Sequence, residues 1–334
     1  MNLPKVSLLI PCHNISSHRF FSLKEAVKIK YPNLEILVLN DYSTDNTLEI
    51  LNDFSKRDER IRVIDLKDYH EHIGLGFNRD FLINQAQGEY VLFLDDDDKI
   101  YPSVFDSFAK NYQKGLELIR YKYVVNIPLN KSGTIRMNAP YFKNKNIDWN
   151  DPKSTFINTL SFSWGVFIKK QFYLDICKKY NEKFDLHIFE DQRFMLFLYL
   201  NCQKYKYVNK VLIKYLLRPN SLVMKIENVN KIVGNVIWQY DEFFKKIAKF
   251  NLLNEQDFDL MKSNTLYQLK TFFWMLLRTN KKNKKCEVQE FLVTKLKEYI
   301  TKYKIREPYK LSFVCKVLYK IFSHKLLSTK NIKR

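Results

Sequence analysis

Glycine, long apolar runs and a leader segment are scarce or missing in this sequence. Only 7 of its 334 residues are glycine, and residues 11–20 contain none. A glycine-rich loop that wraps phosphate groups is therefore absent after the first apolar segment. No stretch reaches the roughly 18 consecutive apolar residues that a membrane-spanning helix needs. The start, Met1–Cys12, has no basic leader and no small-residue cleavage site, so we expect a strand there and not a signal peptide.

Cysteine and histidine do not indicate a disulfide framework or a zinc site. The five cysteines are scattered, odd in number, and form no C-x-x-C pair. This pattern is typical of a reduced, cytoplasmic protein. His70 and His72 stand two residues apart, but a zinc site needs more ligands than these two. We interpret both as surface histidines.

Positive charge is concentrated at the C-terminal end. Residues 278–334 hold 17 Lys or Arg and 4 Glu, which is +13 of the net charge of +20. Residues 311–327 also place apolar side chains on one helical stripe. A basic, amphipathic segment of this kind suits an anionic membrane surface. Alternatively, the stripe packs on the rest of the chain as a helical cap, and both interpretations stay open.

Short apolar runs alternate with helix-length segments through the first hundred residues. The predicted strands are residues 5–10, 34–39, 61–64 and 90–94, and the predicted helices are residues 20–30, 46–56 and 75–86. This alternation predicts an α/β fold with a Rossmann-like, mostly parallel sheet and flanking helices. Ligands of such sheets bind beyond the carboxyl ends of the strands. Further along, residues 161–168 and 206–217 favour strands, residues 189–201 favour a helix, and the pattern is helical from residue 221 onward.

Four consecutive aspartates, Asp95–Asp98, directly follow the apolar run YVLFL. Adjacent carboxylates repel one another, so the run is costly at a strand end unless a cation neutralises it. Oxygen ligands suit Mg²⁺ or Mn²⁺, whose remaining positions are filled by diphosphate oxygens and water. The sequence therefore predicts a divalent-metal site here, and the alternative is a solvated acidic loop.

Four segments follow one another through the first hundred residues: VSLLIPCHN, LEILVLNDYSTDNT, HIGLGFNRDFLINQAQGEY and GEYVLFLDDDDKIYP. In this order they resemble family 2 glycosyltransferases with the GT-A fold, and the last resembles the D-x-D region of that family. The resemblance is good over residues 5–102 and weaker as far as residue 223. It implies an inverting enzyme that moves one sugar from a UDP-linked donor to a hydroxyl of a glycan or glycolipid. Bacterial lipooligosaccharide or capsule is the acceptor that the family suggests.

The resemblance also assigns the nucleotide pocket. Asp41 would accept a hydrogen bond from the base, usually uracil, and Pro11 and Asn14 would line the same pocket. Tyr42 and His72 depart from the family pattern, in which Gly and Asn are usual at these positions. The choice of base therefore stays open.

Arg79 and the aspartates would bind the diphosphate and the metal. The Arg79 guanidinium would pair with phosphate oxygens, and the alternative is a surface salt bridge with a neighbouring Asp80 or Glu89. Asp95 would reach the ribose or the metal, and Asp97 would bind the metal. Asp96 competes for either role, because four adjacent aspartates leave the register open.

Glu190 and Asp191 resemble the acidic pair of the family near the acceptor, at the start of a helix. Asp191 would be the general base that deprotonates the acceptor hydroxyl, and Glu190 would support it or contact the acceptor. Helix capping alone is the alternative. Trp164 resembles the aromatic wall that holds the sugars, or it is a core residue. Arg218 resembles an arginine that reaches the diphosphate, or it stands in a plain turn.

These interpretations divide the chain into a catalytic domain, residues 1–222, and a helical, basic region, residues 223–334. The catalytic domain would have a nucleotide-sugar half, 1–115, and an acceptor half, 116–222. The expected partners are a nucleotide sugar, Mn²⁺ or Mg²⁺, a glycan or lipid-linked acceptor, and the inner face of the cell membrane. No nucleic acid is expected, because no recognition motif occurs. A nucleotidyltransferase that makes nucleotide sugars and a non-catalytic basic binding protein are the two other classes that stay open.

Overall fold

The computed structural model describes residues 3–15, 21–129, 133–138, 147–159, 162–184, 190–216, 229–278 and 285–305. Arg218 and the predicted amphipathic segment 311–327 lie outside these residues.

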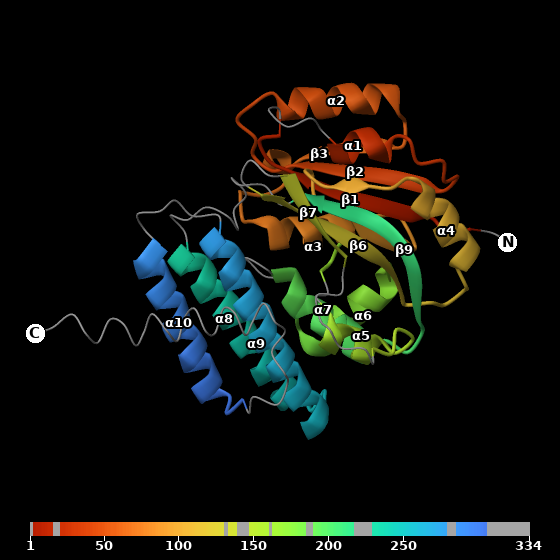
Figure 1. Cartoon of the computed structure of the whole chain (residues 1–334). Helices are drawn as coiled ribbons and strands as arrows, with labels where there is room; N and C mark the ends of the chain where they lie inside the picture. Colours follow the sequence, from red (N-terminus) through yellow and green to blue (C-terminus); the bar gives the residue numbers. More distant parts are fainter. Residues whose placement is uncertain are drawn as a thin grey trace, which may run out of the picture.

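Parallel strands with crossover helices form the first half of the sheet (Figure 1). The strand order is β3-β2-β1-β4, and every residue of β1, β2 and β4 is buried. Strands covered on both faces need continuous apolar runs, which is why these segments could be predicted. The elements are β1 (Val6–Cys12), α1 (Phe21–Ala26), β2 (Leu34–Asn40), α2 (Thr47–Arg57), β3 (Ile61–Asp65), the short η1 (Leu66–Asp68), α3 (Leu75–Gln85) and β4 (Tyr90–Phe93).

The second half of the sheet is mixed and continues from β4 in the order β8-β6-β9-β5, with β7 paired to β6. Its elements are β5 (Lys99–Ile100), α4 (Ser103–Asn111), β6 (Leu118–Leu129), β7 (Gly133–Asn138), α5 (Pro152–Asn158), β8 (Val166–Lys169), α6 (Lys170–Tyr180), α7 (Glu190–Asn201) and β9 (Tyr205–Leu216). Within the described residues, nine strands thus make one sheet flanked by helices, which confirms the predicted fold class. β8 begins later than the predicted strand 161–168, because Gly165 before it has a φ of +86° that a strand cannot contain.

Three helices follow the sheet: α8 (Val229–Phe250), α9 (Glu255–Arg278) and α10 (Lys285–Lys302). Figure 1 shows them side by side, and α8 contacts α7 while α9 contacts α5 and α10. The Lys153 ammonium and the Asp257 carboxylate join α5 to α9 at 2.7 Å. Within residues 229–278 and 285–305, these helices agree with the helical pattern predicted from residue 221 onward. In the part of the chain that is described, no helix is both long and apolar enough to span a bilayer.

Gly88, between α3 and β4, belongs to a buried hydrogen-bond cluster that joins β1, β2 and the start of β4. The Glu35 carboxylate accepts from the Ser7 hydroxyl and from the N–H groups of Gln87 (2.6 Å) and Gly88 (3.0 Å). A Cβ at position 88 would lie 2.6 Å from the Ser7 nitrogen and 2.7 Å from the Tyr90 oxygen, which is closer than atoms can approach.

We therefore expect Gly88→Ala to lower the free energy of unfolding by about 3 kcal/mol, because backbone must move and buried hydrogen bonds weaken. Gly234→Ala is the matched control. Its Cβ would meet nothing within 4 Å on α8, and alanine should raise helix stability by up to about 1 kcal/mol. Urea unfolding of the two variants measures both effects. Equal stabilities would contradict the prediction.

Candidate active site

The carboxyl ends of β1 and β2 are tied together by backbone and side-chain hydrogen bonds. The Asp41 N–H donates to the Cys12 carbonyl at 2.8 Å. Asn14 takes a left-handed φ of 52°, which asparagine tolerates better than most residues. In this conformation its N–H donates to the Ser43 hydroxyl (3.0 Å) and its side-chain oxygen accepts from the Thr44 N–H (2.7 Å). Pro11 is buried within β1, directly before Cys12.

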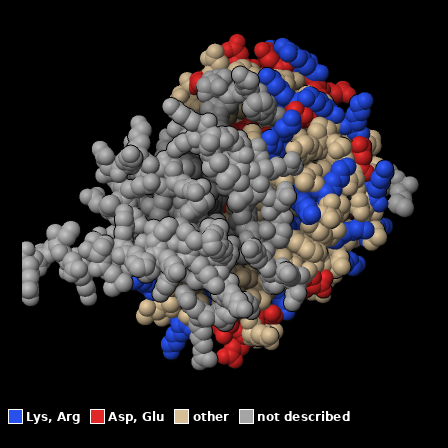
Figure 2. Space-filling view, in the orientation of Figure 1, with Lys and Arg blue, Asp and Glu red and all other residues tan. Residues whose placement is uncertain are grey.

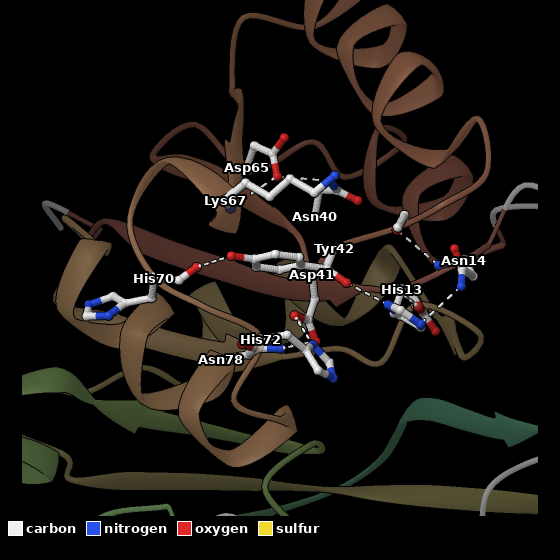
Figure 3. A network of polar contacts seen from close by, with 12 residues as sticks. His13, Asn14, Asn40, Asp41, Tyr42, Asp65, Lys67, His70, His72 and Asn78 are labelled. Atoms are coloured by element: carbon white, nitrogen blue, oxygen red, sulfur yellow. Dashed lines mark hydrogen bonds and ion pairs between the residues drawn. The ribbon is translucent and has the colours of Figure 1, made fainter.

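Asp41 lies at the centre of a polar network beyond β2 (Figure 3). Its side chain is nearly buried, and its two oxygens accept from the Asn78 amide (2.8 Å) and contact His72 Nδ1 (2.7 Å). The His13 ring approaches the Asp41 carbonyl, and its centroid lies 5.8 Å from that of His72. Tyr42 meets the His72 ring edge-on at 6.0 Å. An acceptor carboxylate walled by flat rings suits a nucleotide base.

His72 is therefore more than the surface histidine that the sequence indicated. Its side chain is half-exposed, yet it contacts Asp41 directly and faces two other rings.

Arg79, on α3, reaches across to the end of β4. It is 3% exposed, and its guanidinium donates to Asp95 Oδ1 at 2.8 Å. It also lies over the Phe93 ring, 6.0 Å from the centroid. The alternative of a surface salt bridge with Asp80 or Glu89 is wrong, because Arg79 is buried and its partner is Asp95.

The four aspartates after β4 occupy different surroundings. Asp98 is fully buried and accepts the Leu216 N–H of β9 at 2.9 Å, so it links β4 to the far strand. Asp96 accepts the His13 N–H at 3.2 Å. Burial raises the pKa of Asp96, and the charge of Asp97 adds to the effect. Burial also raises the pKa of Asp97 to about 7, with a further contribution from Asp95.

A cation beside Asp96 and Asp97 would stabilise their ionised forms, which burial and the neighbouring carboxylates disfavour. The donor set of Asp95 and Asp97 therefore fits Mg²⁺ or Mn²⁺. Within the described residues, no group of three or more His, Cys, Asp or Glu side chains is arranged to hold a metal ion, so these two carboxylates would need diphosphate oxygens and water as further ligands. Asp98 serves the sheet instead, since one of its oxygens is used by β9.

Asp191 lies in the first turn of α7 and is held by the segment before β8. Its carboxylate accepts from the Ser163 N–H (2.9 Å) and hydroxyl (3.3 Å), and it is 5% exposed. Burial raises the pKa of Asp191, while the positive charge of Arg79 opposes this shift. Glu190 is the first residue of α7, and its side chain lies outside the described part.

Trp164 is 3% exposed and stands inside an aromatic stack. Phe162 lies parallel to its indole at 4.5 Å and Tyr215 at 5.3 Å, while Tyr123 meets it edge-on at 4.7 Å. A bridge pairs its backbone with Phe93 at the end of β4. Trp164 is thus next to Ser163 in the chain and paired with the end of β4, two residues before Asp95. This position fits both sequence interpretations, an aromatic wall for the sugars and a core residue.

The structure brings Asp41, Arg79 and the aspartates to one edge of the sheet, but sequence reasoning missed several of their partners. Asn78 holds the Asp41 carboxylate and Ser163 holds the Asp191 carboxylate. Neither Asn78 nor Ser163 has a sequence signal of its own. His13 and Tyr215 were also missed. A signal existed for Tyr215, since residues 206–217 were predicted as a strand, and β9 ends at this edge.

A parallel half-sheet with carboxylates beyond β2 and β4 belongs to the class of open α/β domains that bind their ligands at the carboxyl ends of the strands. Residues 7–167 match the model of the family described as Glycosyl transferase family 2, so this part of the chain is similar to the glycosyltransferases of that family. The putative glycosyltransferase EpsH of Bacillus subtilis is 24% identical over 68% of this chain and 65% of its own length. The chain thus spans less than two thirds of the curated relatives that it matches.

Two solved structures have the same fold. Staphylococcus aureus TarS 1-349 in complex with UDP-GlcNAc has a TM-score of 0.51 at 18% identity, over 92% of this chain and 95% of that one. The mannosyltransferase PcManGT of Pyrobaculum calidifontis, in complex with GDP-Man and Mn²⁺, has a TM-score of 0.54 at 11% identity, over 99% and 88%. At these identities the likeness concerns the fold alone.

Proposed function

We propose that this chain is a metal-dependent, inverting glycosyltransferase that moves one sugar from a UDP-linked donor to a hydroxyl group. The position of Arg79 is the observation that supports this most. Its guanidinium pairs with Asp95, and its charge also acts on the buried Asp191. Carboxylates suited to a metal and a carboxylate suited to a general base are therefore neighbours, as a single displacement needs.

In this proposal the nucleotide base lies against Asp41. Each oxygen of a carboxylate has two lone pairs, so Asp41 can accept from a base N–H while it keeps Asn78 and His72. The TarS structure contains UDP-GlcNAc and the mannosyltransferase structure contains GDP-Man. We favour a UDP-linked donor, because the ring N–H of uracil can donate to this carboxylate, whereas cytosine has no such N–H. Guanine also has a ring N–H, so turnover of a GDP-sugar would assign the pocket to guanine instead.

We expect Asp41→Ala to weaken the binding of UDP by about 10- to 100-fold, since a hydrogen bond to a charged group contributes about 1.5–3 kcal/mol. Calorimetric titration with UDP and Mn²⁺ measures the change. Asp53→Ala on α2 is the control, because Asp53 is half-exposed and pairs only with the neighbouring Lys56 within the described residues. An affinity within twofold of the unchanged protein would place the base elsewhere.

Asp97 and Asp95 would hold the Mn²⁺ or Mg²⁺, which supplies positive charge to the departing diphosphate when it is bound. Arg79 would keep Asp95 oriented and add a second positive charge at the same place. Asp191 would take the proton of the acceptor hydroxyl. Ser163 holds that carboxylate in position through two hydrogen bonds. Glu190, at the neighbouring position, would contact the acceptor.

A panel of nucleotide sugars, assayed with Mn²⁺, with Mg²⁺ and with EDTA, tests this function. We expect metal-dependent turnover of one UDP-sugar, and a product whose anomeric configuration is opposite to that of the donor. A product that retains the configuration would rule out the single displacement. No turnover and no thermal stabilisation with any nucleotide sugar would leave a basic binding protein as the better interpretation.

We also propose that the acceptor is a bacterial surface glycan or its lipid-linked precursor, met at the inner face of the cell membrane. Basic charge supports this, because residues 278–334 carry +13. Figure 2 shows further Lys and Arg side chains over α4 and β9, and β9 itself contains three lysines and no acid. Flotation with anionic vesicles, with and without the residues after Tyr309, tests it. Equal binding of both forms would remove the tail from the proposal.

A further inference from the structure

Tyr215, near the end of β9, carries an aromatic ring to the middle of the candidate site. Its ring lies parallel to the Trp164 indole, at 5.3 Å and 9°. Phe162 lies parallel to the same indole at 4.5 Å and 12°. No ring contact joins Phe162 to Tyr215 among the described aromatic pairs, so we place them on opposite faces of Trp164. Both faces of the indole are then covered, and the partly exposed Tyr215 and Phe162 are the rings that a ligand can reach.

Three backbone anchors place this stack between the two halves of the site. Ser163, next to Trp164, donates to Asp191. Trp164 itself is bridged to Phe93, two residues before Asp95. On the other side, the N–H of Leu216, next to Tyr215, donates to Asp98 at 2.9 Å.

The electrostatic surroundings of Tyr215 agree with this position. Burial raises the pKa of its phenol, and four carboxylates raise it further, namely Asp98, Asp95, Asp97 and Asp191. The phenol therefore stays protonated and is a hydrogen-bond donor. Its hydroxyl has no hydrogen-bond partner among the described residues. A flat ring beside a free O–H donor suits a sugar, which offers an apolar C–H face and several oxygens.

We propose that Tyr215 contacts and orients the transferred sugar, with its ring against the sugar and its hydroxyl donating to a sugar oxygen. This inference rests on the proposed function. Trp164 is then the support behind Tyr215, and the predicted contact between sugar and aromatic wall is made by the tyrosine. The nucleotide would not depend on Tyr215, because the base pocket is built at the ends of β1 and β2.

Tyr215→Phe and Tyr215→Leu test the two contacts separately. The Phe variant keeps the ring and loses only the hydroxyl, so we expect turnover of the active nucleotide sugar to fall about tenfold. The Leu variant loses both contacts, and we expect a fall of about 100-fold or more. For both variants, the affinity for UDP with Mn²⁺ should stay within twofold, which also shows that they are folded.

Tyr207→Phe is the matched control on the same strand. The Tyr207 ring stacks on Trp149, and its buried hydroxyl has no hydrogen-bond partner within the described part of the chain. It should leave turnover unchanged. If the unchanged protein is active and Tyr215→Phe matches Tyr207→Phe, with Tyr215→Leu losing less than threefold, the inference is overturned while the function stands. If the unchanged protein turns over no nucleotide sugar, the proposed function fails and takes the inference with it.

Discussion

Asp97→Ala is expected to lower metal-stimulated turnover by about a thousandfold or more while the chain stays folded. Burial and the nearby Asp95 raise the pKa of this carboxyl to about 7, so a bound cation would stabilise its ionised form. A metal ion that stabilises the leaving diphosphate lowers the activation free energy by several kcal/mol. Each 1.4 kcal/mol or so changes the rate tenfold. The fold should tolerate alanine, because the change removes a buried charge from among like charges.

Thermal melting in UDP, with Mn²⁺ added stepwise, measures binding, and donor turnover measures the rate. The unchanged protein should gain stability from Mn²⁺ and the variant should not. Asp106→Ala, on an exposed position of α4, is the control for removing one acidic charge. If Asp97→Ala keeps metal-stimulated turnover within tenfold, the cation is bound by other aspartates of the run and the assignment of Asp97 is wrong.

The first half of the fold could be predicted closely because it is built from buried parallel strands. The predicted strand at 34–39 is β2, Leu34–Asn40, and the predicted run at 90–94 is β4, Tyr90–Phe93. Such strands need apolar residues on both faces, so their burial is written in consecutive positions. In the second half, β6 alternates lysine, arginine and asparagine with apolar residues. Its pairing with both β8 and β9 depends on tertiary contacts that no local pattern carries.

The site divides in the same way. Asp41 and Asp95–Asp98 stand directly after strands, so their meeting at one edge of the sheet follows from topology. Which aspartate does what does not follow, because adjacent carboxylates are equivalent in the sequence. The structure separates them through partners far along the chain: Arg79 pairs with Asp95, and Leu216 with Asp98. The roles proposed for the remaining site residues stay predictions.

Asp191→Asn should lower turnover by about 100- to 10,000-fold, the usual contribution of a general base. The amide oxygen can still accept the Ser163 N–H, so the start of α7 should keep its geometry. The affinity for UDP should not change, because the base pocket lies at the ends of β1 and β2. Asp175→Asn, exposed on α6, is the control. Turnover within threefold of the unchanged protein would assign the proton transfer to another group. Glu190 would then be the first residue to substitute.

The pH dependence of turnover separates a base from a residue that only caps the helix. Burial raises the pKa of Asp191, and a base works only when it is ionised. The rate should therefore rise with pH through a limb above the ordinary range of aspartate. The Ser163 hydroxyl donates to the ionised form at 3.3 Å. Ser163→Ala removes this stabilisation, so it should move the limb to higher pH. If Asp191 only caps α7, Ser163→Ala should lower the stability of the protein and leave the pH dependence of turnover unchanged, because a helix cap takes no proton from the acceptor.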